Sequence, residues 1–299
     1  MDFESHYDRG NRRAPRNGIG GGLLRLLFSH PRILGALVLM VIGVFTYYSR
    51  TEEKVNPFTG EEVRVILTPE QEKALGLQSV PQMMQQFGGE SRDPAAKALV
   101  NRIGAKLLAA KDEIIRRRGL DDFDYDYQFR VLQDRQTINA FALPGGPVFI
   151  TEALLTKLPS EDAVAGVIGH EIGHVLAWHS NKQMAKNSLL QAAASAVATA
   201  ASDGRGSGQA IGQLVGQVLQ TKYGREDETE SDRIGVQLMM AAGYRPEALL
   251  DVMDVLEKAK SEGARPPEWL SSHPTEASRR ENIRKFISFF RNDPYGVWK

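Results

Sequence analysis

The residues of this chain best suited to chemistry form the pentapeptide HEIGH, which runs from His170 to His174. Histidines four positions apart lie one above the other on the same face of a helix, where two imidazole nitrogens can reach one metal ion. Glu171 would then lie beside that ion, where a carboxylate can act as a general base. The spacing predicts a hydrolytic metal centre if the segment is helical.

The sequence around the pentapeptide predicts that helix. Ser160 is a suitable N-cap, and Glu161 and Asp162 suit the first turn of a helix that follows it. Apolar residues then recur at helical spacing, at Val164, Val167, Ile168, Ile172 and Val175. The chain has no cysteine, which excludes disulfides and thiolate sites and leaves His, Asp and Glu as its strong metal ligands.

A catalytic zinc ion takes three protein ligands and keeps one position for water, so a further ligand must lie on a second element. The acidic stretch from Gly224 to Gly235 opens an apolar helix that should end before Gly243. In it Glu228 and Asp232 are four positions apart, so that one can ligate the metal while the other accepts a hydrogen bond from a ligand histidine. Such acids also suit a solvated first turn, and the presence of HEIGH favours the metal site.

At this point the chain resembles the gluzincin metallopeptidases related to HtpX and the Oma protease, in peptidase family M48. Four motifs in this order carry the resemblance, which extends from Thr68 to about residue 290. They are NAFALPGG from Asn139, HEIGH, the E-x-x-x-D of Glu228 and Asp232, and His273-Pro274 followed by Arg279.

The resemblance implies a role for each matched residue. One zinc ion per chain would be held by His170, His174 and Glu228, with Asp232 as the partner of a ligand histidine. Glu171 would be the catalytic base, taking a proton from the water that the metal activates. The implied activity is hydrolysis of peptide bonds without a covalent intermediate.

The other matched residues have less specific roles. In thermolysin-like enzymes an edge strand reading Asn-Ala-Phe binds the substrate backbone as an added strand, and Asn139, Ala140 and Phe141 look similar. His273 is either an electrophile that helps to hold the oxyanion or a structural cap on the next helix. Arg279 could orient the cleft.

His179 lies five residues after His174, so a continuous helix would turn it away from the metal-facing side. We therefore expect a structural role for His179.

The remaining pattern predicts the scaffold. A helix is expected over 93–118 and strands over 127–132, 137–143 and 148–151, with a helical hairpin near the cleft within 189–220. The expected fold class is α+β and predominantly helical: a zincin-like metallopeptidase domain with a small β-sheet and an N-terminal transmembrane helix.

Residues 33–49, between Arg32 and Arg50, carry no charge and reach the short end of the range for a spanning helix. The arginine-rich segment before them favours a cytoplasmic N-terminus. A cleaved signal peptide and a buried helix are the alternatives. We predict a basic tail (1–32), an anchor (33–49), a juxtamembrane linker (50–67) and a metallopeptidase domain (68–299), single-pass in a bacterial inner membrane with that domain periplasmic.

Composition narrows the partners. Lys and Arg balance Asp and Glu at 37 each, which gives no bulk field for nucleic acid. The expected partners are protein or peptide substrates and the membrane.

The predicted function is a membrane-anchored zinc endopeptidase of unfolded or envelope proteins. A zinc-dependent chaperone-like protein with little proteolysis is the alternative, and the E-x-x-x-D motif argues against a non-proteolytic hydrolase.

Overall fold

The computed structural model describes residues 31–201, 223–262, 267–274 and 277–297. The chain separates into two compact units. The larger comprises residues 47–189 and 207–299, and the smaller comprises residues 1–46 and 190–206. Every candidate site residue named above belongs to the larger unit. The domain boundaries expected after residues 32, 49 and 67 stay predictions.

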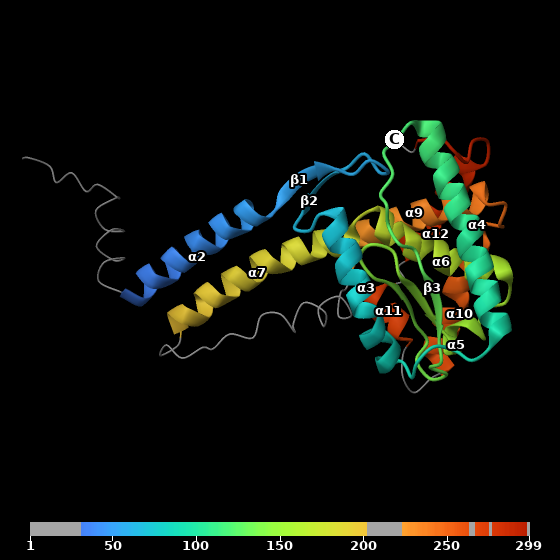
Figure 1. The fold of residues 1–299 in the computed structure, drawn as a ribbon, viewed down its shortest axis with the longest axis horizontal. Helices are drawn as coiled ribbons and strands as arrows, with labels where there is room; N and C mark the ends of the chain where they lie inside the picture. The colour runs from blue at the N-terminus through green and yellow to red at the C-terminus, as the bar shows by residue number, and fades with distance from the viewer. Residues whose placement is uncertain (1–30, 202–222, 263–266, 275–276, 298–299) are drawn as a thin grey trace, which may run out of the picture. The chain divides into compact units, whose positions relative to one another are not determined.

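The described part is predominantly helical with two small sheets, in agreement with an α+β class (Figure 1). The strands are β1 (Glu52–Val55), β2 (Glu62–Val65), β3 (Phe129–Leu132), β4 (Ala140–Ala142) and β5 (Val148–Thr151). The helices are α2 (Pro31–Arg50), α3 (Pro69–Gln86), α4 (Pro94–Arg118), α5 (Glu152–Leu155), α6 (Glu161–Leu176), α7 (His179–Ala201), α9 (Arg225–Ala241), α10 (Ala248–Glu262), α11 (Glu268–Ser272) and α12 (Ala277–Phe290).

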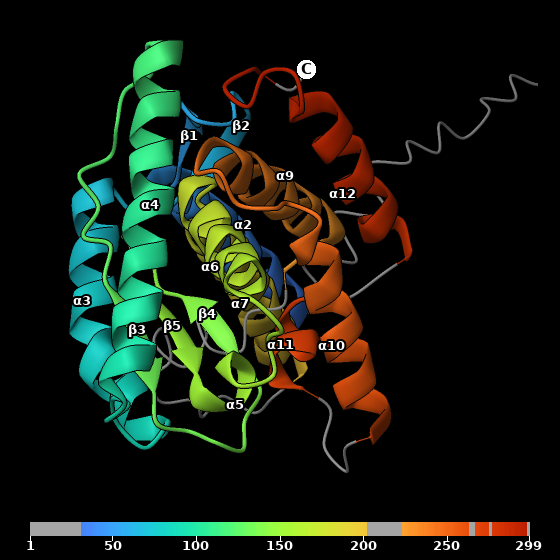
Figure 2. The ribbon, with the colours of Figure 1, turned by 90° about the vertical axis from the view of Figure 1, so that its right-hand side faces the viewer.

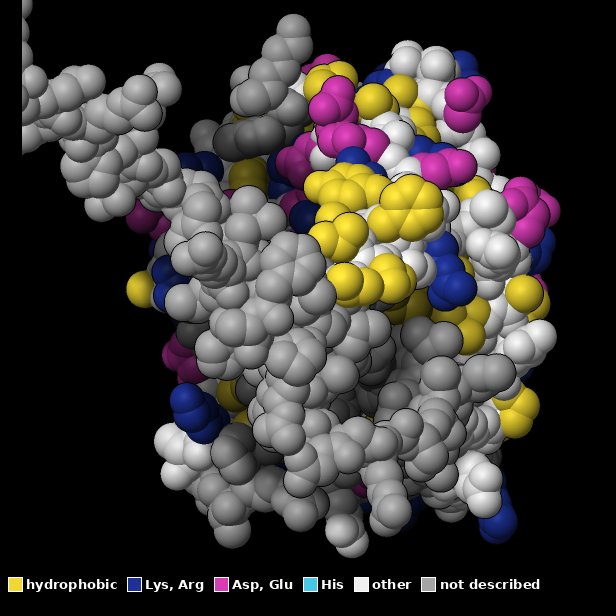
Figure 3. All heavy atoms as spheres, turned by 90° about the vertical axis from the view of Figure 1, so that its left-hand side faces the viewer, with side chains coloured by type: hydrophobic (Ala, Val, Ile, Leu, Met, Phe, Trp, Pro, Cys, Tyr) yellow, Lys and Arg dark blue, Asp and Glu magenta, His cyan; other side chains and the backbone are white. Residues whose placement is uncertain are grey.

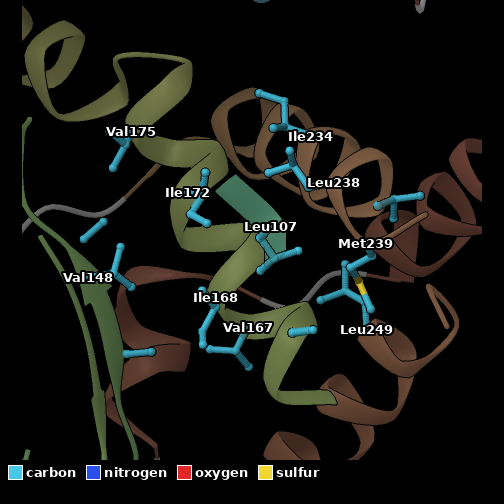
Figure 4. Packing of buried hydrophobic residues seen from close by; sticks show 14 of the residues in the cluster. Leu107, Val148, Val167, Ile168, Ile172, Val175, Ile234, Leu238, Met239 and Leu249 are labelled. Carbon is cyan, nitrogen blue, oxygen red and sulfur yellow. The ribbon is translucent and has the colours of Figure 1, made fainter. Parts of the chain in front are cut away.

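Helix α6 carries the HEIGH pentapeptide and forms the centre of the larger unit. Its predicted cap is confirmed, because the backbone N–H of Ala163 donates to the Ser160 hydroxyl. All its residues from Ala163 onward are buried. Helices α4, α9 and α10 and the strands β4 and β5 pack around α6 (Figure 2). Apolar side chains of these elements form one core, as Figure 4 shows for Ile168, Ile172 and Leu238.

The three-stranded sheet has the order β3-β5-β4, which leaves β4 at its edge. Strand β4 pairs antiparallel with β5, whereas β3 pairs parallel with it. The predicted hairpin between β4 and β5 is confirmed, and its turn uses Gly145 and Gly146 at φ 74° and 126°, angles that favour glycine. One face of the sheet contacts α6, and the other carries a smaller apolar cluster that includes Met83 of α3 and Phe149.

The segment 50–67, predicted as a juxtamembrane linker, has secondary structure of its own. It contains the antiparallel pair β1 and β2, which the sequence did not predict. The turn between them is held by Asn56, whose Oδ1 accepts hydrogen bonds from the backbone N–H groups of Phe58 and Thr59. Its Nδ2 donates to the carbonyl of Leu176, at the end of α6. Phe58 is buried in the main core, so this segment is part of the folded unit.

A helix, α2, does cover the residues predicted to form the anchor. Within the described residues, however, we find no helix with the length and apolar character needed to span a membrane. The basic tail lies almost wholly outside the described residues. Of the helical hairpin expected within 189–220, α7 accounts for the part up to Ala201, and the rest of that prediction lies outside the described residues.

Candidate metal centre

Three helices bring four potential metal ligands together inside the larger unit. His170 and His174 come from α6, Glu228 from the first turn of α9, and His273 from the residue after α11. One donor atom from each lies within 4.8 Å of the others. All four side chains are at most 1% exposed. No histidine is visible among the described residues on the face shown in Figure 3, in agreement with this burial.

The convergence depends on a close approach of α6 and α9. A Cβ atom at Gly173 would lie 2.7 Å from the Ser231 hydroxyl and 2.8 Å from the Ser231 carbonyl, so only glycine fits there. The Ser231 hydroxyl in turn donates a 2.5 Å hydrogen bond to the carbonyl of His170. The first turn of α9 is thereby held against the HEIGH face of α6.

The donor atoms are spaced as a zinc ion requires. Atoms about 2.1 Å from a tetrahedral ion lie roughly 3.4 Å apart. The Nε2 atoms of His170 and His174 are 3.0 Å apart, and the Glu228 carboxylate oxygens lie 3.6 Å and 3.5 Å from them. Glu228 Oε2 is buried and forms no hydrogen bond, and its close charged neighbour is Arg279 Nη1 at 2.7 Å. The residues fit one zinc ion.

Asp232 lies where a partner for a ligand histidine is needed. Its Oδ1 is 2.9 Å from Nδ1 of His170, so Nδ1–H can donate to it and Nε2 is left to face the metal position. Arg279 donates from Nε and Nη2 to the same carboxylate, at 2.8 Å and 2.7 Å. Arg279 therefore fixes Asp232, behind His170, and it also lines a small pocket together with Tyr223 and Pro274.

The charges of the centre favour metal binding. Burial lowers the pKa of His174 well below its usual value, which keeps its imidazole neutral. Burial would raise the pKa of Glu228, but His273, His174 and Arg279 hold it well below the usual range. Burial alone would lower the pKa of Arg279, but the carboxylates of Asp232 and Glu228 outweigh burial and raise it above its usual value. Glu228 is therefore ionised and Arg279 charged.

Glu171 has a partner that the sequence did not reveal. The indole N–H of Trp269 on α11 donates to Glu171 Oε1 at 3.1 Å. The Trp269 ring also stacks on His273, with a centroid distance of 4.8 Å. The only sequence signal for Trp269 is its spacing of four residues from His273 on a short helix.

The side chain of His273 faces the centre. Its Nδ1 lies 2.8 Å from Glu228 Oε1 and 3.3 Å from Nε2 of His170, and its Nε2 lies 3.6 Å from Glu171. Burial would lower the pKa of His273, but the carboxylates of Glu228 and Glu171 raise it. These partners belong to the metal centre. Residues 275–276, just before α12, lie outside the described part of the chain, so the alternative role of His273 as a cap stays a prediction.

Asn139, Ala140 and Phe141 occupy the start and body of the edge strand β4. Ala140 faces the main core, and Phe141 stacks on Phe149 with centroids 4.9 Å apart. Asn139 Oδ1 is buried without a hydrogen-bond partner. The structure thus places this motif at an edge next to α6, and the backbone N–H of Trp269 donates to the carbonyl just before it, at Ile138.

Two more rings contact His174. Tyr223 stacks on its imidazole, with centroids 3.9 Å apart and an interplanar angle of 24°. His179 lies with Nδ1 2.8 Å from Nδ1 of His174. His179 is thus on the side of His174 away from the metal position, as expected, and is not one of the four clustered ligands; the sequence did not predict its direct contact with His174.

The fold and the centre define a candidate zinc site built on a HExxH helix. The model of Peptidase family M48 matches residues 104–287, more than half of the chain, and the chain belongs to that family. Among similar proteins is the mitochondrial metalloendopeptidase OMA1 of Schizosaccharomyces pombe, 28% identical over 219 residues, which are 72% of this chain and 61% of that protein.

Two further relatives come from other organisms. The mitochondrial metalloendopeptidase OMA1 of Bos taurus is 29% identical over 259 residues, 82% of this chain and 48% of its own length. The Beta-barrel assembly-enhancing protease of Escherichia coli (strain K12) is 28% identical over 205 residues, 64% of this chain and 39% of its own. The matched regions thus cover 39% to 61% of these relatives.

Proposed function

We propose that this chain hydrolyses peptide bonds of protein substrates, with one zinc ion held by His170, His174 and Glu228. The observation that carries the proposal is the convergence of their donor atoms at tetrahedral spacing. Glu171 lies between the two histidines on the same helix. Membership in Peptidase family M48 supports the same conclusion.

A zinc ion in this site would polarise the scissile carbonyl and lower the pKa of a bound water. Glu171 would serve as the general base that takes a proton from the attacking water and returns it to the leaving amine. Asp232 holds His170 in the tautomer that presents Nε2, and Arg279 keeps Asp232 in place. His273 is the fourth donor in the cluster. Because a catalytic zinc site takes three protein ligands and keeps one position for water, we assign His273 to stabilisation of the oxyanion.

We assign backbone recognition to the edge strand β4. An extended substrate can add to a strand whose outer edge is unpaired, and β4 is the last strand of its sheet. Asn139 supports this role because its buried Oδ1 is an unused acceptor at the start of the strand. Glu171 is only 1% exposed and accepts a hydrogen bond from Trp269, so in this conformation it is closed to a substrate.

The test is casein cleavage by zinc-loaded wild type and Glu171→Gln. General base catalysis contributes about 10²- to 10⁴-fold, so the variant should lose at least ~10²-fold in rate while it keeps its zinc. Undiminished cleavage would refute the role of Glu171. Suppression of client aggregation that survives the substitution, with no cleavage by wild type, would favour the chaperone-like alternative.

We also propose that α2 anchors the chain in a bacterial inner membrane, with its N-terminus cytoplasmic and the metallopeptidase domain periplasmic. The support is the uncharged stretch 33–49 and the row of apolar side chains that α2 leaves at least 40% exposed, namely Val38, Met40, Val41, Ile42, Val44, Phe45 and Tyr48. Retention in carbonate-washed membranes is the expected result. Recovery in the soluble fraction would contradict this proposal and leave the peptidase site untouched.

A further inference from the structure

The turn between α6 and α7 has an unusual backbone. Helix α6 ends at Leu176, and Trp178 follows with φ 58°, the one positive φ at a non-glycine residue in the described part of the chain. A left-handed conformation is unfavourable for a bulky residue and persists only where the surroundings impose it. The Trp178 ring is 5% exposed and packs on Phe123 with centroids 4.9 Å apart, which holds it in place.

This turn decides where His179 lies. On a continuous helix, five residues after His174 would place a side chain about 140° around the axis from it. Because the helix is interrupted at Trp178, α7 instead begins at His179, and the His179 ring lies beside that of His174 with centroids 4.8 Å apart. The side chain is fully buried.

The contacts of the two rings define their tautomers. If Nε2 of His174 faces the metal, its Nδ1 carries the proton and must donate. The atom it meets at 2.8 Å is Nδ1 of His179, which must therefore accept. The proton of His179 is then on Nε2, which lies 3.1 Å from Oε2 of Glu230 and can donate to it. Glu230 is itself fixed by Arg233, at 3.0 Å.

We propose that His179 and Glu230 are positioning residues that orient His174 for zinc, as Asp232 does for His170. This inference rests on the proposed function. The two ligand histidines are thus held by carboxylates of the same helix, α9, in two ways. Asp232 bonds to His170 directly at 2.9 Å, whereas Glu230 reaches His174 through the His179 ring.

The alternative is that the buried pair merely fills space between α6, α7 and α9. A filler could be replaced by a ring of similar shape without an effect on the metal. Hydrogen-bonded residues that position a ligand cannot be replaced in this way, because loss of such partners typically weakens metal binding or activity by about 10- to 100-fold. The zinc affinity and the geometry around the metal therefore distinguish a positioning role of His179 and Glu230 from a space-filling one.

The experiment measures the zinc dissociation constant of the full chain by competition with a chelating dye, and the visible spectrum of the Co²⁺-loaded protein. For His179→Phe, which keeps a ring but no nitrogen, we expect a dissociation constant at least about tenfold higher and an altered spectrum. His179→Asn, whose carbonyl can still accept from His174, should recover part of the affinity. Glu230→Gln should raise the dissociation constant about threefold or more, because the charge is lost but an acceptor remains.

Glu161→Gln is the matched control. Glu161 is the first residue of α6 and accepts a hydrogen bond from Arg102, but it lies outside the metal centre. It should bind zinc as wild type does. If His179→Phe and Glu230→Gln match this control in affinity and spectrum, the inference is wrong.

If His179→Phe does not fold, the test rests on the zinc dissociation constant of Glu230→Gln compared with that of Glu161→Gln. A wild type that binds zinc but cleaves no casein would contradict the proposed function and leave this comparison of affinities intact.

Discussion

The Arg279 guanidinium and the Asp232 carboxylate form a buried, bidentate ion pair directly behind the metal centre. Nε donates to Oδ2 and Nη2 to Oδ1, and Arg279 is 3% exposed while Asp232 is wholly buried. Planar, two-point contact of this kind requires a guanidinium and cannot be reproduced by an ammonium group. The orientation of His170 therefore depends on Arg279, whose Nη1 also lies 2.7 Å from Oε2 of the proposed ligand Glu228.

Arg279→Lys should consequently weaken both the fold and zinc binding. Loss of one charged hydrogen bond to a buried carboxylate should lower the free energy of unfolding by about 1.5–3 kcal/mol. We expect zinc affinity to fall by about 10-fold or more, because Asp232 is no longer fixed. Denaturant unfolding and chelator competition measure the two effects.

The neighbouring Arg280 provides the control. It pairs with Asp254 and Glu257 at the surface, so Arg280→Lys should change stability by less than about 1 kcal/mol and leave zinc affinity unchanged. Equal effects at the two arginines would show that Arg279 has no special relation to the centre.

Gly173→Ala should disrupt the site without removing any ligating atom. The added Cβ would lie 2.7 Å from the Ser231 hydroxyl and 2.8 Å from its carbonyl, which forces α9 away from α6. Overpacking of this kind costs about 1–3 kcal/mol, and Glu228 would move with α9. Thermal unfolding and zinc affinity should both decrease.

Gly166→Ala is the control, because it adds the same methyl group at another position of α6. On the same helix, a Cβ at Gly166 meets nothing closer than 3.4 Å, to Leu249 Cδ1. This variant should be near neutral in both measurements. A Gly173→Ala protein with the stability and zinc affinity of Gly166→Ala would contradict the close approach of α6 and α9.

Glu72 should make the stability of the fold depend on pH. Burial raises the pKa of this side chain from 4.5 to about 7, even though Tyr125 donates a hydrogen bond to it. Between these values the folded chain holds a proton that the unfolded chain has released. Stability should therefore fall as pH rises from 4.5 through 7, by up to about 1.4 kcal/mol per pH unit.

Glu72→Gln removes this proton equilibrium and keeps a hydrogen-bonding side chain. The free energy of unfolding, measured in urea between pH 5 and pH 8, should decline less steeply for the variant than for wild type. Identical slopes would mean that Glu72 is not the group responsible.

Local signals in the sequence predicted α6, its cap at Ser160 and the shared face of His170 and His174, because one helix determines all three. They also predicted that Glu228 and Asp232 belong together, since both lie on one face of α9. The structure places them in the roles that the spacing left open: Glu228 faces the histidines and Asp232 lies behind His170.

Contacts between distant segments could not be predicted in this way. Trp269 reaches Glu171 across 98 positions of the chain, through a helix of five residues with a weak sequence signal. The contact of His179 with His174 was not predicted, because it depends on one dihedral angle, at Trp178, a residue whose type does not favour positive φ. The strands β1 and β2 are short and mixed in polarity, and Asn56 fixes them through the distant Leu176.

The zinc content of two matched variants tests the central claim most directly. Glu171 and Glu228 are both 1% exposed and lie in the same centre, but we assign proton transfer to the first and metal ligation to the second. After dialysis against a weak chelator, Glu171→Gln should retain one zinc ion per chain and Glu228→Gln should retain little. Full zinc in Glu228→Gln, or its loss from Glu171→Gln, would contradict the assignment.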